Sequence, residues 1–202
     1  MYNKNIYCFR HGETDWNKEK RFQGLTDITL NETGRNQANS LIPIIAKLNI
    51  KTIYSSPLKR AVETANIIAK SLNLNVIKID DLQEVNTGKA SGLLYEEVDN
   101  IFGGGSFENW KSTLPEHDSF GFPDGETKLA LRQRAVKTIL DIAEHSSEQN
   151  FAVVTHGFFL KQLLLDLGSE NHKGLKNAEV IHFTYNITKK DLQFLSRFTG
   201  PT

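Results

Sequence analysis

The sequence predicts an α/β fold with a mostly parallel central sheet. Short apolar runs typical of buried strands alternate with segments whose apolar residues recur at helical spacing, through most of the chain. At 202 residues the chain is long enough for one domain with a full hydrophobic core, or at most one domain with a modest insertion. It contains no internal repeat and no low-complexity tract.

The N-terminal part supplies three of the expected strands and two of the helices. Apolar residues at helical spacing predict a helix over residues 32–48, with Asn31 as its N-cap. Pro43 lies inside this helix and is expected to kink it or to leave one carbonyl unpaired. Pro57 is expected in the first turn of the second helix. The strands are expected over residues 3–9, 52–55 and 76–79.

The C-terminal part begins with an irregular segment, residues 80–124, that is rich in glycine and aromatic residues. The aromatic side chains argue against disorder, so we expect a partly helical cap. They are Phe102, Phe107, Trp110, Phe120 and Phe122. Beyond it we expect helices over 126–145 and 158–167, a strand over 150–155, and a hairpin from 179–185 and 192–198. The first of these helices is expected to face inward through Leu129, Val136, Ile139 and Ala143.

The charge and cysteine content exclude several classes of protein. Lys plus Arg and Asp plus Glu both number 24, so no basic field exists to attract nucleic acid or an anionic membrane. Cys8 is the single cysteine and has no internal disulfide partner, which favours a reducing compartment. No signal-peptide core and no apolar run of membrane-spanning length is visible. We therefore expect a cytoplasmic protein.

Polar side chains follow three of the expected strands. The strands lead into Arg10-His11-Gly12, into Ser55-Ser56-Pro57 followed by Lys59 and Arg60, and into Thr155-His156-Gly157. In parallel sheets the ligand crevice lies beyond the carboxyl ends of the strands. If the strands ending in His11 and His156 are neighbours, both imidazoles face the same crevice.

Arg60 indicates what the crevice binds. It falls in the first turn of its helix, where the macrodipole disfavours a cation, so a bound anion is the expected partner. Two arginines, together with the partial positive charge at helix N-termini, indicate a site that binds a phosphoryl group. A glycine after each histidine is expected to let the backbone come close to that group.

Several chemistries lack their motifs. The sequence has no His-x-x-x-His or Cys-x-x-Cys pattern, no Gly-x-Ser-x-Gly elbow and no Walker loop. Covalent catalysis by a neutral imidazole remains, with guanidinium groups stabilising the transferring phosphoryl and a nearby carboxylic acid protonating the leaving group. Such chemistry needs no metal. The residues alone leave another explanation open, in which both histidines are ordinary polar residues at strand ends.

Five blocks of sequence resemble the histidine phosphatase superfamily, the phosphoglycerate-mutase-like enzymes. The blocks are Phe9-Arg10-His11-Gly12-Glu13-Thr14 with Trp16-Asn17, Gln23-Gly24, Leu30 and Gly34; Ser55-Ser56-Pro57-Leu58-Lys59-Arg60-Ala61 with Glu63-Thr64-Ala65; Leu82-Gln83-Glu84-Val85-Asn86 with Gly88 and Gly92; Asp124-Gly125-Glu126-Thr127; and Val153-Val154-Thr155-His156-Gly157. They occur in family order from about residue 5 to residue 160. The resemblance implies a three-layer phosphoglycerate-mutase-like fold, as a single domain over 1–202 with a small cap insertion at about 95–124.

The resemblance also implies roles for individual residues. His11 matches the nucleophile that becomes phosphorylated, and Glu84 matches the general acid that later activates water. From the residues alone, Glu84 would be a solvated loop carboxylate and Glu126 a first-turn carboxylate favoured by the helix dipole. The expected phosphate pocket and substrate-binding residues are Arg10, Asn17, Gln23, Gly24, Arg60, His156 and Gly157.

The segment 95–124 favours a phosphatase over a mutase. Lys111 is its only lysine or arginine, against acids at Glu96, Glu97, Asp99, Glu108, Glu116, Asp118 and Asp124. Such a segment is badly suited to the second phosphate that a mutase must grip. We therefore expect a phosphomonoesterase similar to the small bacterial-type phosphatases, including the alpha-ribazole and broad-specificity groups. It would act on a small phosphorylated metabolite without a metal or other cofactor, and the sequence predicts no oligomeric state.

Two alternatives remain: a cofactor-dependent phosphoglycerate mutase, and a catalytically silent phospho-ligand-binding module on the same scaffold. The cap aromatics also allow two interpretations. They stack on an aromatic or apolar leaving group, or, as is more usual for buried aromatic residues, they pack the cap itself.

Overall fold

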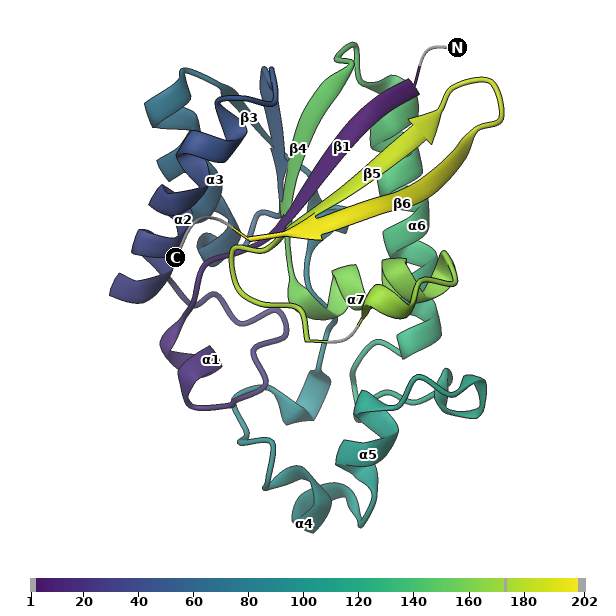
Figure 1. The fold of residues 1–202 in the computed structure, drawn as a ribbon. Coiled ribbons are helices and arrows are strands. Elements are labelled where there is room, and N and C mark those ends of the chain that lie inside the picture. Colours follow the sequence, from purple (N-terminus) through teal and green to yellow (C-terminus); the bar gives the residue numbers. More distant parts are fainter. Residues whose placement is uncertain (1–2, 173, 200–202) are drawn as a thin grey trace.

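A computed structural model of the chain describes residues 3–172 and 174–199 and shows a six-stranded sheet between helices (Figure 1). The sheet has the strand order β3-β2-β4-β1-β5-β6. β3, β2, β4 and β1 run parallel to one another. β5 is antiparallel to β1, and β6 is antiparallel to β5. The strands are β1 (Asn3–Arg10), β2 (Thr52–Ser55), β3 (Asn75–Lys78), β4 (Asn150–Thr155), β5 (Val180–Asn186) and β6 (Asp191–Phe198). The predicted mostly parallel sheet and its C-terminal hairpin are confirmed.

Helices cover both faces of the sheet and form the outer two of three layers (Figure 1). On one face α2 (Glu32–Ile45) and α3 (Lys59–Leu72) pack against alternate residues of β1, including Phe9. On the other face α6 (Lys128–His145) and α7 (Gly157–Asp166) pack against the intervening residues, including Cys8. A strand covered on both faces is apolar throughout, which is why the strands appear in the sequence as continuous apolar runs.

Short helices and turns lie beyond the carboxyl ends of the parallel strands (Figure 1). They are α1 (Asp15–Lys18), α4 (Val98–Phe102), α5 (Ser106–Lys111) and the 3₁₀ turns η1 (Asp80–Leu82), η2 (Gly88–Ala90), η3 (Pro115–His117) and η4 (Glu170–His172). The segment 80–124 is thus partly helical, as predicted. In the ranges that the structure describes, no helix combines the length and the apolar character needed to cross a lipid bilayer.

Two helix boundaries near proline residues need correction. α2 continues only two residues beyond Pro43 and ends at Ile45, three residues earlier than predicted. Pro43 has no N–H to donate to the carbonyl four residues earlier, so the helix lacks that hydrogen bond close to its end. α3 begins at Lys59 with Leu58 as N-cap, so Pro57 precedes the helix and does not lie in its first turn.

The prediction for the start of α6 was wrong at two positions. Thr127 caps the helix by accepting from the Ala130 backbone N–H, so Glu126 lies outside the first turn. Its carboxylate instead pairs with the Arg134 guanidinium, at 3.0 and 2.7 Å. Leu129 is 42% exposed, because the buried side of this turn is formed by Lys128, whose ammonium donates to two backbone carbonyls of the 109–112 stretch.

Candidate active site

The two predicted histidines lie side by side. β1 and β4 are adjacent parallel strands in which Arg10 is opposite Thr155, so the residues that follow them leave the sheet together. The ring centroids of His11 and His156 are 5.2 Å apart, with the ring planes at 60°. The strands are neighbours and the two rings lie together, but the expectation that both imidazoles face one crevice is wrong for His156, which is fully buried and does not line the cavity.

His11 is held in the form that suits a nucleophile. Its Nδ1 lies 2.7 Å from the carbonyl oxygen of Gly12, which can only accept, so Nδ1 carries the proton and Nε2 keeps its lone pair. Burial, and then the charges of Arg60 and Arg10, hold the pKa of His11 well below its ordinary value. We predicted that the arginines keep this imidazole neutral, and burial is the larger cause.

Arg10 lies against the start of α7. Its Nη1 donates to the carbonyl oxygen of Leu175 at 2.6 Å, and its Nε has no hydrogen-bond partner within the described ranges. A Cβ atom at Gly157 would lie 2.9 Å from that Nε. Glycine at 157 therefore makes room for the Arg10 guanidinium, and at Gly12 a Cβ would collide with the Gly34 carbonyl at 2.3 Å. Close packing within the protein is thus one reason for both glycines; their expected approach to a phosphoryl group stays a prediction.

Arg60 is the second buried guanidinium. It is the second residue of α3, in the first turn as predicted, and it is fully buried. Nη1 donates to the carbonyl of Thr26 and Nη2 to that of Gly24, both at 2.8 Å. Burial lowers the pKa of Arg60 to about 10, with the Glu84 carboxylate opposing the shift. The group is therefore charged at neutral pH and held in place by carbonyls.

Asn17 presents its amide nitrogen to the site. It belongs to the capping box of α1, in which its Oδ1 accepts from the backbone N–H and the hydroxyl of Thr14, both at 3.1 Å. The side chain of Asn177 donates to the same oxygen at 3.3 Å and to the His11 carbonyl at 3.0 Å. Because Oδ1 is occupied, the free end of the Asn17 amide is its nitrogen, a hydrogen-bond donor.

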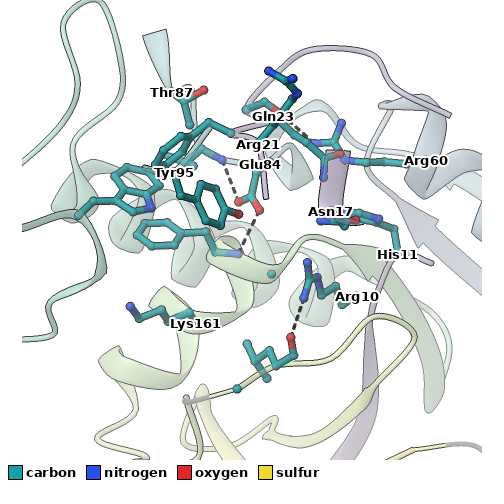
Figure 2. Close-up of a pocket in the computed structure, with 18 of the residues that line it drawn as sticks. Arg10, His11, Asn17, Arg21, Gln23, Arg60, Glu84, Thr87, Tyr95 and Lys161 are labelled. Carbon is teal, nitrogen blue, oxygen red and sulfur yellow. Dashed lines mark hydrogen bonds between the residues drawn. The ribbon is translucent and has the colours of Figure 1, made fainter. Parts of the chain in front are cut away.

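Glu84 is fixed on the first turn of α7. Its Oε1 accepts from the backbone N–H groups of Val85 and Phe159, and its Oε2 from that of Phe158, each at 3.0 Å. Figure 2 shows its carboxylate within the pocket, bonded to that turn. Two backbone donors at the helix N-terminus and a third from Val85 hold the carboxylate, so it is not the solvated loop carboxylate that the residues alone indicated.

Most of the predicted site residues line one cavity of about 220 Å³. It is lined by Arg10, His11, Asn17, Gln23, Gly24, Arg60, Glu84 and Gly157, together with Arg21, Phe22, Val85, Thr87, Tyr95, Trp110, Phe158, Lys161, His172, Gly174 and Leu175. His156 is not among these residues. It lies fully buried beside His11. Its Nε2 is 2.8 Å from the Ser56 hydroxyl oxygen, and its Nδ1 has no hydrogen-bond partner in the part of the chain described.

The aromatic residues of the cap divide between the two expected roles. Trp110 lines the cavity and stacks on Phe158, with 4.1 Å between ring centroids and 8° between planes. Phe102 and Phe120 pack against Phe122 instead, at 5.3 Å each. Packing of the cap is thus the main role, and Trp110 with Phe158 forms one apolar wall of the site.

Other residues of the site were not predicted from the sequence. Asn177 lies in a polar loop before β5 and reaches His11 only because β5 pairs antiparallel with β1. Lys161 is a cation within the apolar helix α7, and that contrast in the sequence was the one available signal. Among the described residues, no group of three or more His, Cys, Asp or Glu side chains is placed to hold a metal ion.

Comparisons with known proteins agree with this geometry. The model of the histidine phosphatase superfamily, branch 1, matches residues 6–196. Phosphoserine phosphatase 1 of Hydrogenobacter thermophilus is 35% identical over 184 residues, which cover 88% of this chain and 85% of that protein.

Two solved structures show the same fold. Phosphoglycerate mutase from Bacillus anthracis superposes with a TM-score of 0.84 at 27% identity, covering 96% of this chain and 92% of that one. A phosphoserine phosphatase mutant from Entamoeba histolytica, in complex with phosphoserine, gives 0.81 at 28% identity and covers 96% of both chains.

The chain belongs to branch 1 of the histidine phosphatase superfamily. Within that family it is a phosphoric monoester hydrolase with a phosphoglycerate-mutase-like fold.

Proposed function

We propose that this enzyme is a metal-independent phosphomonoesterase that acts on a small phosphorylated metabolite through a phosphohistidine at His11. One observation carries the proposal: a neutral, buried imidazole lines a small cavity beside the guanidinium groups of Arg10 and Arg60. The cavity volume of about 220 Å³ fits a phosphoryl group with a short leaving group.

In the first step Nε2 of His11 attacks phosphorus and the bond from phosphorus to the leaving oxygen breaks. Arg10, Arg60 and the Asn17 amide nitrogen hold the three phosphoryl oxygens, whose charge is greatest in the transition state. Two fixed guanidinium groups supply the positive charge that a metal ion supplies elsewhere, and this supports metal independence. The leaving oxygen takes a proton and departs as an alcohol.

Glu84 is the proposed source of that proton. A bound phosphate dianion beside the carboxyl group favours its protonated form, which is the form that this step requires. In the second step water attacks phosphorus, the bond from phosphorus to Nε2 breaks, and the Glu84 carboxylate takes the proton from water. Inorganic phosphate leaves, and both His11 and Glu84 return to their starting forms.

A phosphoglycerate mutase is the second candidate, because one similar structure carries that name. A mutase must retain a second phosphate near the site. The single lysine of the cap, Lys111, is exposed and pairs with Glu108 at 2.7 Å. This arrangement favours hydrolysis. Conversion of 3-phosphoglycerate in the presence of a bisphosphate primer, at a rate above phosphate release, would instead support the mutase.

Hydrolysis of an aryl phosphate by the purified protein tests the proposal and also excludes a silent binding module. We expect turnover that EDTA leaves unchanged and that His11→Ala abolishes. His145→Ala is the matched control, since His145 is exposed on α6 and, among the described residues, its ring bonds to the Asp141 carbonyl of its own helix. Activity lost in EDTA and restored by a divalent cation would contradict metal independence, and near-native activity of His11→Ala would contradict the mechanism.

A further inference from the structure

The cavity has a second polar end, away from the phosphate pocket. It is formed by Lys161 of α7 and His172 of η4, which both line the cavity with His11. Figure 2 shows Lys161 on the opposite side of the pocket from His11. A substrate whose phosphoryl group meets His11 would direct its leaving group towards this end.

Lys161 is a partly buried cation whose charge is not neutralised by the described residues. Its ammonium donates to the Lys111 carbonyl at 2.7 Å and lies 5.2 Å from the centroid of the Phe158 ring. The charged groups that act on it, Lys128 and Lys111, are both cations, and burial lowers its pKa to about 8. Two N–H donors of the ammonium remain for a ligand, and an anion would relieve the electrostatic cost.

His172 offers the complementary group. It is 6% exposed, and its Nδ1 lies 2.8 Å from the Ser169 carbonyl, so Nδ1 carries the proton in the neutral ring. Its Nε2 is buried and finds no hydrogen-bond partner in the described ranges. Nε2 is therefore an acceptor that lacks a donor, in the same cavity as a cation that lacks an anion.

We infer that Lys161 and His172 form a specificity subsite for a leaving group that carries a carboxylate next to a hydrogen-bond donor. Lys161 binds the carboxylate, and Nε2 of His172 accepts from the neighbouring amine or hydroxyl. An α-amino or α-hydroxy carboxylate joined to phosphate through a short chain has these groups in this order. The stacked rings of Trp110 and Phe158 form the apolar wall beside the chain.

The inference rests on the proposed phosphatase activity and deepens it by naming the substrate class. It is consistent with a similar phosphatase having been solved with phosphoserine. The rival explanation is structural: Lys161 ties α7 to α5 through the Lys111 carbonyl, and His172 closes its own turn. That explanation predicts changes in stability and no change in substrate preference.

Three substrates separate the two explanations when kcat/KM is measured for each. O-phospho-L-serine carries both groups, phosphoethanolamine lacks the carboxylate, and 3-phosphonooxypropanoate lacks the amine. We expect the native enzyme to prefer phosphoserine to each of the others by about tenfold or more, as for a hydrogen bond to a charged group.

Two variants assign the preferences to their residues. Lys161→Met is expected to lower the phosphoserine to phosphoethanolamine ratio about tenfold, and His172→Phe to lower the phosphoserine to 3-phosphonooxypropanoate ratio. Lys137→Met, at an exposed site on α6, is the control and should leave both ratios unchanged. Ratios that stay the same in Lys161→Met and His172→Phe overturn the subsite. No turnover of any substrate by the native enzyme contradicts the proposed function itself, so the two failures are distinguishable.

Discussion

The imidazole rings of His11 and His156 meet edge to face, with 5.2 Å between their centroids, at the ends of two adjacent parallel strands. Only His11 lines the cavity, and His156 lies beside it with its Nε2 near the Ser56 hydroxyl. Both rings are buried next to the same guanidinium groups, and the pKa of each is held well below its ordinary value. The pair therefore stays uncharged at pH values at which a free histidine would begin to take up protons.

This lowered pKa predicts how stability depends on pH. In the unfolded chain both rings titrate near the ordinary value of 6.5, while in the folded protein they take up protons only at lower pH. Below about pH 6.5 the unfolded chain binds more protons, so the free energy of unfolding falls as the pH falls. Urea unfolding between pH 5 and pH 8 measures it. His156→Asn should flatten the dependence and His145→Ala should not; a free energy that rises on acidification contradicts the assignment.

The proposed acid role of Glu84 predicts an effect that depends on the leaving group. Glu84→Gln removes the proton donor and keeps the shape of the side chain. Alkyl phosphates, which leave poorly, should slow by about 10²-fold or more, and aryl phosphates with good leaving groups much less. Glu96→Gln, at an exposed cap position, is the matched control. Equal slowing of both substrate types would argue against proton donation by Glu84.

Asn177 is predicted to act through Asn17. Its side chain donates to Asn17 Oδ1 and to the His11 carbonyl, so it orients the amide that we propose holds the phosphoryl group. We expect kcat/KM to fall about tenfold in Asn177→Ala, with little further loss when Asn17→Ala is added. A double-mutant cycle on one aryl phosphate tests this, with Asn75→Ala at an exposed position on β3 as the control. Losses that simply add would mean that the two residues work independently.

Arg60 is predicted to tolerate no replacement, including lysine. Its fixed fork donates to the carbonyls of Thr26 and Gly24, and an ammonium cannot reproduce that geometry. Arg60→Lys should lower kcat/KM by about 10²-fold and reduce the rise in melting temperature that inorganic phosphate causes. Arg35→Lys, where the arginine is about half exposed and pairs with Glu63, is the control. Unchanged stabilisation by phosphate would place the anion elsewhere.

The sequence predicted those parts of the site that follow from sheet geometry and local helix electrostatics. His11 and His156 each follow an apolar run, and parallel strands bring such ends together. Arg60 was identifiable because a cation is unfavourable in the first turn of a helix. The sheet itself was predictable because strands buried on both faces are continuously apolar.

The remaining parts depend on contacts that no local pattern encodes. Asn177 approaches His11 because the loop before β5 returns beside β1, where the Ala178 N–H donates to the Arg10 carbonyl at 2.9 Å. Glu84 looked like a loop carboxylate because its partners, the N–H groups of Phe158 and Phe159, lie far along the chain. Leu129 was predicted to face inward because it is hydrophobic. In the structure the long side chain of Lys128 occupies the buried side of that turn instead.

The most direct test of the account is to identify the residue that carries the phosphoryl group during turnover. The enzyme is mixed with phosphoserine or an aryl phosphate, quenched within milliseconds under alkaline conditions that preserve phosphohistidine, and digested for mass spectrometry. The account predicts phosphate on the peptide that contains His11, formed at least as fast as steady-state turnover and absent in His11→Ala. Turnover without any phosphorylated His11, or with the phosphate on His156 instead, would contradict it.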